Sequence, residues 1–312
     1  METNEMLSMR MDTSDDWIRQ RTGILQRHVA THETTRDLAA AAAERALEQL
    51  PSGRSIDQLI LATTTPDRAC PAMAPEVASR LGLGTIPAFD IAAVCSGFLY
   101  ALAAARNAVC SGAADRVLIV AAETFTRLLD PNDRTTVPLF GDGAGAVIIE
   151  AGHAEDPGAI GEIVLRSDGA LADLIRAEGA AVGSAPGSMD PYFHMQGQAV
   201  FLNAVVRMQE AAQIALTSAG WDVEEVDHFV GHQANARILA AVADRLDLPA
   251  SRVRMNLRRV GNTAAASIPI ALDEALRSNT ITRGQRIALA AFGGGATWGA
   301  ATLTAPDTTF TI

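Results

Sequence analysis

One order of strands and helices occurs twice along this chain, and this duplication constrains the fold more than any other feature. The first half predicts apolar strands at 56–65, 86–94, 115–123 and 144–150, separated by helices at 37–50, 71–84 and from Ser96 onward. The second half predicts helices at 201–220, 236–249 and 262–278, and strands at 223–233, 251–257, 284–293 and 298–305. "RLGL" at 80–83 matches "RLDL" at 245–248, and "RVLIVAAE" matches "RIALAAFG", an offset of about 165–170 residues. The sequence therefore predicts an α/β protein of two similar halves whose sheets are covered by helices on both faces.

The two halves are expected to share one site. Open α/β sheets bind ligands outside the carboxyl ends of their strands. Superposed on this offset, Cys95 and Asn262 fall at equivalent places, each at the start of the third helix of its half, and His232 ends a strand. We predict a half of residues 1–155 that carries the cysteine and a half of residues 156–312 that carries the histidine and the asparagine.

The composition argues against several classes of protein. The 312-residue chain has no lysine among its 25 basic residues, which excludes a Schiff-base lysine and the lysine of a phosphate-binding loop. A net charge of −11 argues against a nucleic-acid partner, and no uncharged apolar run is long enough to cross a membrane. The acidic N-terminus lacks a signal-peptide core and three cysteines cannot all pair, so we expect a cytoplasmic protein. Cys110, inside a predicted helix, is expected to lie in the core.

Cys95 stands between a predicted strand and a predicted helix in "FDIAAVCSGFLYALAAA". A lone cysteine is often no more than a small buried apolar residue. A helix N-terminus, however, has partial positive charge and free N–H groups, which lower the pKa of a thiol and favour the thiolate. We therefore interpret Cys95 as a candidate nucleophile whose own N–H group is available to an oxyanion. His232 in "GHQAN" and Asn262 in "GNTAAAS" have ordinary alternatives, a structural histidine and a helix cap.

Seven motifs in order carry a resemblance to a known family. They are "DTSDDWIRQRTGI", "AVCSGFLYAL", "DPNDR", "LFGDGAGAV", "GHQAN", "GNTAAASIPIAL" and "AFGGGATWG", and they run from Asp12 nearly to the C-terminus. Together they resemble β-ketoacyl-acyl-carrier-protein synthase III, a condensing enzyme of the thiolase-like fold. The resemblance implies a layered α-β-α-β-α architecture of two similar halves.

The resemblance also implies a reaction and the residues that perform it. Cys95 would be acylated by an acyl-CoA primer, and the N–H groups of Cys95 and Gly294 would form the oxyanion hole. His232 and Asn262 would bind the thioester carbonyl of malonyl-acyl-carrier protein and stabilise the enolate left by decarboxylation. Two neutral donors suit an enolate, because they stabilise its charge without protonating it. The expected product is a β-ketoacyl-carrier protein that starts fatty-acid or polyketide synthesis, made by a homodimer with no permanently bound cofactor.

Further residues match binding positions of the family. Trp17 and Arg134 match a pair that sandwiches the CoA adenine, and Arg21 matches a residue near the CoA phosphates. Cys70 lies in a loop that crosses the family's dimer interface and caps the primer pocket, so its small side chain predicts primers larger than acetyl. An acidic carrier protein needs a local basic patch, for which the candidates are Arg237, Arg252, Arg254, Arg258 and Arg259. The alternatives are a hydrophobic anchor for the tryptophan, a surface ion pair for Arg134 and a solvated charged face for the cluster.

Two other functions stay open, and three further patterns are set aside. The chain could be a non-condensing acyltransferase that passes the acyl group from Cys95 to a hydroxyl or amine, or a catalytically silent partner subunit. "GDGAGA" is followed by the strand-like "VIIE" rather than by a helix, so we expect a tight turn near the site and no dinucleotide. The histidine pairs 28/32 and 228/232 lack the further ligands that a metal site needs, so no metal is expected.

The N-terminal segment departs from the family. About 25 residues, including a first strand, usually precede the equivalent of "DTSDDW", whereas eleven precede Asp12 here. We therefore expect that the N-terminal sheet lacks one strand, or that the natural start lies upstream.

Overall fold

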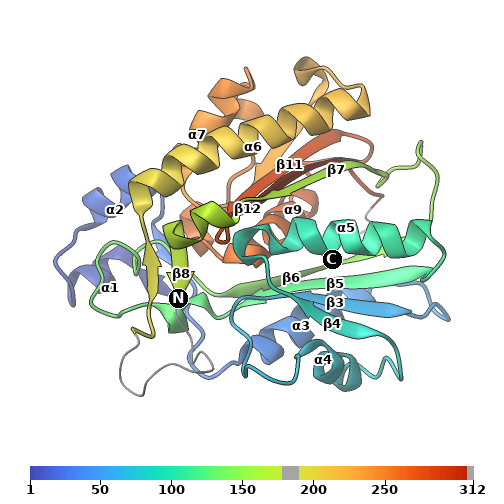
Figure 1. Cartoon of the computed structure of the whole chain (residues 1–312), viewed down its shortest axis with the longest axis horizontal. Helices are drawn as coiled ribbons and strands as arrows, with labels where there is room; N and C mark the ends of the chain where they lie inside the picture. The colour runs from blue at the N-terminus through green and yellow to red at the C-terminus, as the bar shows by residue number, and fades with distance from the viewer. Residues whose placement is uncertain (178–189, 308–312) are drawn as a thin grey trace.

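Two four-stranded sheets stack at the centre of the computed structural model, which describes residues 1–177 and 190–307 (Figure 1). The first sheet has the order β4-β3-β5-β6, in which β6 alone is antiparallel, and consists of β3 (Gln58–Ala62), β4 (Ala88–Ile91), β5 (Arg116–Glu123) and β6 (Gly143–Glu150). The second has the order β10-β11-β12-β7 and consists of β7 (Ile160–Ser167), β10 (His228–Gly231), β11 (Arg286–Gly293) and β12 (Thr297–Thr304).

Helices cover both faces of both sheets. Helices α5 (Gly97–Cys110) and α9 (Ser267–Arg277) lie between the sheets. Helices α3 (Thr35–Leu47) and α4 (Ala74–Arg80) cover the outer face of the first sheet, and α6 (Gly197–Ala219), with α7 (Ala236–Arg245) beside it, covers the second (Figure 1). The predicted α-β-α-β-α architecture is confirmed.

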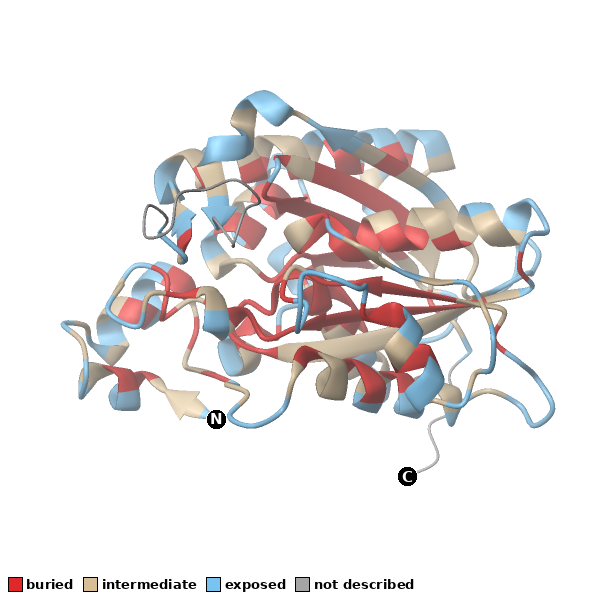
Figure 2. Ribbon diagram, turned by 60° about the horizontal axis from the view of Figure 1, so that its bottom comes forward, coloured by how far each residue is buried: buried red, intermediate tan, exposed pale blue. Residues whose placement is uncertain are grey.

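The burial of the strands explains the layers. Every residue of β5 after Arg116 is buried, as are all four residues of β10 (Figure 2). Strands that are apolar on both faces must be covered on both faces. Helix α5 is rich in alanine, and its first residue Gly97 packs against Ala62 and Ala265, so small side chains let the sheets approach the middle layer.

The N-terminal residues form a small unit of their own. It contains β1 (Glu2–Thr3), α1 (Asn4–Ser8), α2 (Asp15–Thr22) and β2 (Gln26–Arg27), and β1 pairs with β2 rather than with a main sheet. Leu25 N–H donates to Arg258 O at 2.9 Å, so this unit packs on the second half. The division at residues 155 and 156 falls between the strands of the two sheets and stays a prediction.

One edge of the first sheet is open among the described residues. Strand β6 has β5 on one side and no strand on the other, whereas its counterpart β12 lies between β11 and β7. No residue of β6 is fully buried. This agrees with the expectation that the N-terminal sheet lacks one strand.

The predictions for residues 251–257 and for Cys110 differ from the structure. Residues 251–257 form no strand: they contain the 3-10 helix Ala250–Arg252 and the start of α8 (Leu257–Val260), and Val253 makes only one isolated bridge. The side-chain Oε1 of Gln233 accepts the backbone N–H groups of Asn256 and Leu257, which draws this segment away from the sheet. Cys110 is exposed rather than buried, because it ends α5 on the solvent side.

The remaining elements are short, and none of them was predicted. They include β8 (Ile175–Ala177), β9 (Phe193–Met195) and the 3-10 helices Phe125–Leu128, Gly169–Leu174 and Val223–Glu225; two more 3-10 helices lie at the site described below. Within the described ranges, no helix is long and apolar enough to cross a membrane.

Candidate active site

A cavity of about 240 Å³ lies between the two halves, and Cys95, His232 and Asn262 all line it. The three side chains are nearly buried. Cys95 follows β4 of the first sheet, and His232 directly follows β10 of the second. The structure therefore brings together the three polar residues that the sequence placed at strand ends.

Cys95 lies in a 3-10 helix that leads into α5, and this local structure recurs in the second half. Val94 begins the 3-10 helix Val94–Ser96 with a φ of +46°, and Ala264 begins the 3-10 helix Ala264–Ala266, which leads into α9, with a φ of +45°. The counterpart of Cys95 is therefore Ala265, not Asn262 as the sequence superposition predicted. The left-handed residue sets the register of each helix start, and this register was not visible in the sequence pattern.

Backbone strain and close packing fix the cysteine. A β-branched valine at positive φ costs about 1–3 kcal/mol and persists only where its surroundings hold it. Ser96 Oγ donates to Thr297 O at 2.9 Å, and Thr297 Oγ1 donates to Ala93 O at 3.1 Å. A Cβ on Gly293 would lie 2.8 Å from Cys95 N, so only glycine lets β11 pass this close to Cys95.

The thiol of Cys95 differs from the sequence prediction. Burial raises the pKa of Cys95, and the nearby carboxylate of Glu123 raises it further. The helix α5 begins at Gly97, two residues beyond the cysteine, and the surrounding apolar packing outweighs its N-terminal charge. With its pKa raised, the thiol of Cys95 carries its proton at neutral pH.

His232 is a neutral imidazole. The backbone N–H of His232 donates to Ala290 O at 2.8 Å, which holds the residue in line with the second sheet. Burial lowers the pKa of His232 to about 3, so the ring is uncharged at neutral pH. Its Nδ1 atom lies 2.7 Å from Ser267 Oγ, which leaves Nε2 to face the cavity.

The "GDG" segment holds Asn262. Asn262 N–H donates to Leu139 O and its carbonyl accepts Gly141 N–H, each at 2.9 Å. A Cβ on Gly141 would lie 2.4 Å from Val260 O, so this position requires glycine. The expected tight turn is wrong from Gly143 onward, since residues 143–150 form β6. Asn262 Oδ1 accepts Ala264 N–H at 2.9 Å, which orients the amide with its NH₂ group left for the cavity.

Three phenylalanines that the sequence analysis missed form an apolar wall of the cavity. Phe125 stacks on Phe140 with ring centroids 4.4 Å apart, and Phe193 meets both rings edge-on at 5.1 Å. All three line the same cavity as Cys95. They come from three distant segments, so no local pattern linked them.

The predicted CoA residues lie together at the cavity. Trp17 and Arg21 line it, and the guanidinium carbons of Arg21 and Arg134 lie 5.9 Å and 5.3 Å from the Trp17 ring centroid. Arg134 also pairs with Asp12 at 2.7 Å. A base stacked between Trp17 and Arg134 would replace the direct contact of the guanidinium with the ring, and this binding mode stays a prediction.

Gly294 and Cys70, predicted for the oxyanion hole and the primer pocket, do not line the cavity in this chain. Gly294 is buried against Ile175 one residue beyond the contact of β11 with Cys95, so its part in an oxyanion hole stays a prediction. Cys70 is exposed on the loop that precedes α4. Its role in the primer pocket stays a prediction that depends on a second protomer.

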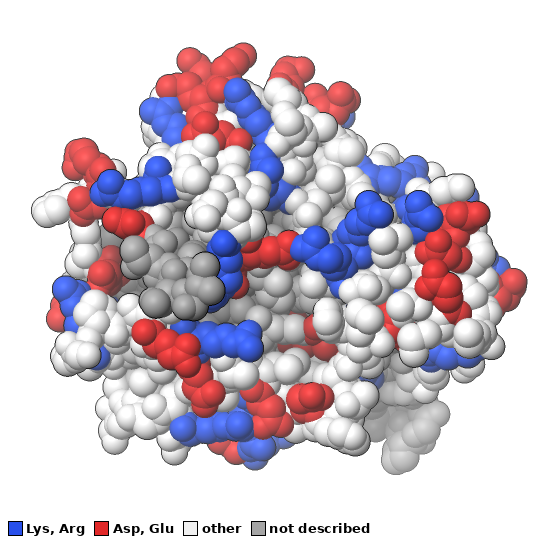
Figure 3. Space-filling model, turned by 180° about the vertical axis from the view of Figure 1, so that it is seen from behind, with Lys and Arg blue, Asp and Glu red and all other residues white. Residues whose placement is uncertain are grey.

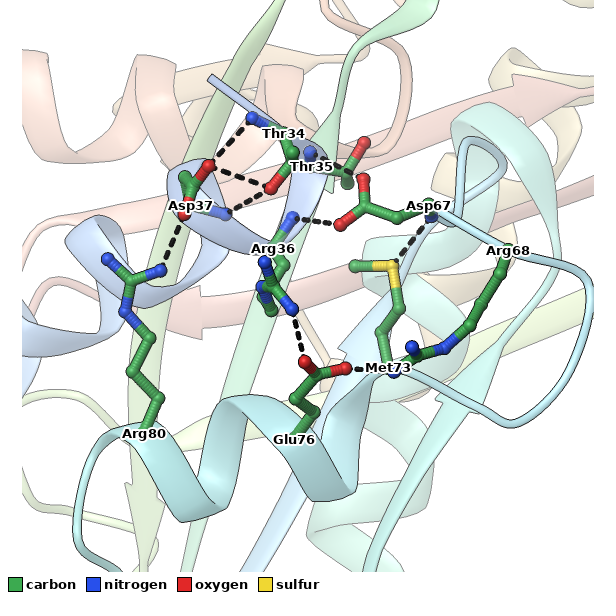
Figure 4. Close-up of polar contacts among 9 residues, drawn as sticks. All are labelled: Thr34, Thr35, Arg36, Asp37, Asp67, Arg68, Met73, Glu76 and Arg80. Atoms are coloured by element: carbon green, nitrogen blue, oxygen red, sulfur yellow. Dashed lines mark hydrogen bonds and ion pairs between the residues drawn. The ribbon is translucent and has the colours of Figure 1, made fainter. Parts of the chain in front are cut away.

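Ion pairs and caps anchor the ends of the loop that carries Cys70 (Figure 4). Asp67 accepts Thr35 N–H at 2.9 Å, and Glu76 pairs with both Arg36 and Arg68. These contacts tie the loop to the first turns of α3 and α4. The side chain of Cys70 itself forms no hydrogen bond with any described residue.

The comparisons with known proteins decide the family. Residues 89–169 match the model described as 3-oxoacyl-[acyl-carrier-protein (ACP)] synthase III, and residues 216–305 match that of its C-terminal part. β-Ketoacyl-[acyl-carrier-protein] synthase III 3 of Streptomyces coelicolor is 54% identical over 97% of this chain and 93% of that protein. This chain belongs to the β-ketoacyl-[acyl-carrier-protein] synthase III family. The family inferred from the motifs is confirmed.

Solved structures agree with this assignment to the synthase III family. The crystal structure of 3-oxoacyl-(acyl carrier protein) synthase III from Pseudomonas aeruginosa PAO1 has a TM-score of 0.93 and 46% identity, covering 99% of this chain and 95% of that one. The priming β-ketosynthase of the R1128 polyketide biosynthetic pathway has a TM-score of 0.92 and 35% identity, covering 99% and 93%.

The arginines proposed for carrier-protein docking in this synthase III are not equivalent. Arg252 and Arg254 donate to backbone carbonyl groups, and Arg259 forms an ion pair with a glutamate of α9. Arg237 and Arg258 are exposed and form no ion pair with any described residue. On the face drawn in Figure 3, basic side chains lie in small groups among acidic ones. Arg237 and Arg258 are therefore the better candidates of the five.

Glu123, which was not predicted as a site residue, is a buried carboxyl group that acts electrostatically on Cys95. It accepts hydrogen bonds from Thr65 Oγ1 at 2.7 Å and from Thr64 N–H at 3.1 Å. Burial raises the pKa of Glu123 to about 7. The sequence did contain a signal for this residue, because a glutamate at the end of an otherwise apolar strand is unusual.

Proposed function

We propose that this chain condenses an acyl-CoA primer with malonyl-acyl-carrier protein, and that Cys95, His232 and Asn262 perform the reaction. The observation that carries the proposal is one cavity in which a thiol faces two neutral side chains. Asn262 has its oxygen engaged by backbone and its NH₂ group free for a ligand. A neutral imidazole and an amide donor suit a negatively charged oxygen that must not be protonated early.

Acylation comes first. Cys95 Sγ attacks the thioester carbonyl of the primer, the carbon–sulfur bond to CoA breaks, and the thiol proton leaves with the CoA sulfur. Thiol–thioester exchange is therefore balanced in protons, and the neutral resting thiol is compatible with it.

Condensation follows on the acylated enzyme. His232 and Asn262 donate hydrogen bonds to the thioester oxygen of the malonyl group, the bond to its carboxylate breaks, and CO₂ leaves. The resulting enolate attacks the acyl carbonyl, and Cys95 leaves as a thiolate that takes up a proton. Loss of one enolate donor should slow this step by about 10²–10³-fold.

Two measurements on two variants test this division of labour. Intact mass after exposure to acyl-CoA reports acylation, and CO₂ release from malonyl-carrier protein reports condensation. Cys95→Ala should abolish the mass shift, whereas Asn262→Ala should keep the mass shift and lose CO₂ release. Cys110→Ala and Asn132→Ala change exposed residues and are the matched controls. Both variants should show the acylation and CO₂ release of the wild type.

The outcomes separate the alternatives. A mass shift that persists in Cys95→Ala, or full CO₂ release in Asn262→Ala, contradicts the proposed roles. Acylation of the wild type without CO₂ release would indicate a non-condensing acyltransferase. The absence of both acylation and CO₂ release would indicate a silent partner subunit.

We also propose a cytoplasmic homodimer formed at the edge of the first sheet. β4 is an edge strand, and its Phe89 is an exposed aromatic side chain. Asp90 of β4 accepts the N–H groups of Met73 and Ala74 at 2.8 Å, so the loop with Cys70 lies next to this edge. An exposed apolar edge strand is a template for pairing with a second chain. Phe89→Lys should shift the mass measured by light scattering from dimer to monomer.

A further inference from the structure

Ser267 connects the helix α9 to the histidine of the site. It is the first residue of α9, its side chain is buried, and its Oγ lies 2.7 Å from His232 Nδ1. The same oxygen accepts the N–H group of Gln233 at 3.3 Å. These are the two hydrogen-bond contacts of the hydroxyl among the described residues.

The proton count of this contact distinguishes the two neutral forms of the ring. A serine hydroxyl has one hydrogen to donate and two lone pairs that accept. Gln233 N–H occupies one lone pair. If Nδ1 carried the ring proton, it would occupy the second lone pair, and the hydroxyl hydrogen would be buried without an acceptor, which is unfavourable. If Nδ1 is bare, the hydroxyl donates to it, and every group in the contact is satisfied.

We propose that Ser267 is a positioning residue that holds His232 in the tautomer with its proton on Nε2. The proposal rests on the function proposed above, in which His232 donates to the enolate oxygen. The hydrogen bond at one ring nitrogen sets which nitrogen carries the proton. Because Nδ1 receives the serine hydrogen, Nε2–H points to the cavity as a donor, in parallel with the NH₂ group of Asn262.

This tautomer predicts which step needs the serine. A ring with its proton on Nε2 cannot accept the thiol proton of Cys95, so acylation does not depend on Ser267. Donation to the enolate does depend on it. Loss of the hydroxyl therefore acts on CO₂ release and not on acylation, which a merely structural role would not separate.

The test uses Ser267→Ala, Ser267→Thr and the control Ser278→Ala, which removes a hydroxyl at the other end of α9. In Ser267→Ala, CO₂ release should fall by about tenfold or more, with unchanged acylation by acyl-CoA and with the loss in kcat rather than in KM. Ser267→Thr keeps a hydroxyl and should restore CO₂ release, and Ser278→Ala should match wild type. Wild-type CO₂ release in Ser267→Ala, or an equal loss of acylation and CO₂ release, overturns the proposal.

A spectroscopic readout on the unaltered enzyme is independent of how the variants fold. The enzyme is labelled with nitrogen-15 histidine, and the signals that disappear in His232→Gln are assigned to His232. Their chemical shifts should show a protonated Nε2 and a bare Nδ1. A protonated Nδ1 in wild type overturns the proposal. Full CO₂ release in His232→Gln would instead overturn the proposed function, while the nitrogen shifts would still report the tautomer.

Discussion

Glu123 should make the enzyme less stable as the pH rises from about 4.5 to about 7. Burial raises the pKa of its carboxyl group from 4.5 to about 7 in the folded protein. Between these values the unfolded chain releases the proton and the folded chain retains it, so the free energy of unfolding falls as the pH rises. Each pH unit is worth about 1.4 kcal/mol, which gives a loss of about 3 kcal/mol that is complete above about pH 7.

Glu123→Gln removes this titration and keeps the shape of the side chain. The free energy of unfolding of the variant minus that of wild type should rise by about 3 kcal/mol between about pH 4.5 and pH 8. Urea unfolding followed by circular dichroism at a series of pH values measures it, at one protein concentration because self-association would add to stability. Glu162→Gln, on the exposed side of β7, is the matched control.

The result that refutes the reasoning is a difference that does not change with pH. In that case the carboxyl group titrates alike in the folded and unfolded chains, and the hydrogen bonds from Thr64 and Thr65 offset the burial completely. If the free energy of unfolding of the variant minus that of wild type fell as the pH rose, the pKa of Glu123 would be lowered rather than raised. These hydrogen bonds would then outweigh burial.

Three further predictions concern ligands and partners. Cys70→Phe should shift preference toward acetyl-CoA over longer primers by about 1–3 kcal/mol in competition assays, and an unchanged preference would remove Cys70 from the pocket. Trp17→Ala should raise KM for acyl-CoA by about tenfold with little change in kcat, since stacking of a base on an aromatic ring is worth about 1–3 kcal/mol; an unchanged KM would place the adenine elsewhere. Arg258→Ala should raise KM for malonyl-carrier protein and leave KM for acyl-CoA unchanged. Arg252→Ala should instead lower the melting temperature, because its guanidinium group binds backbone carbonyls; equal effects of the two variants on KM would contradict this distinction.

Sequence pattern alone predicted two similar α/β halves with covered sheets, and the family resemblance added their layered order. The strands are apolar on both faces, and such strands must be covered by helices on both sides, so the alternation and its repeat predicted the layers. Their positions at strand ends predicted that Cys95, His232 and Asn262 share one site, and the structure places them in one cavity; their roles came from the family resemblance and stay a prediction.

Tertiary structure decided the features that depend on distant neighbours. The register of the duplication depends on left-handed residues, Val94 and Ala264, that no apolar period marks. The direction of the Cys95 pKa depends on burial and on Glu123, both set by packing. The contact of Ser267 with His232 joins residues 35 apart in the chain, and only the stacking of α9 against the end of β10 brings them within a hydrogen bond. Local sequence specifies which elements form, because periodicity and capping act over a few residues. Protonation and hydrogen-bond geometry are properties of the packed site.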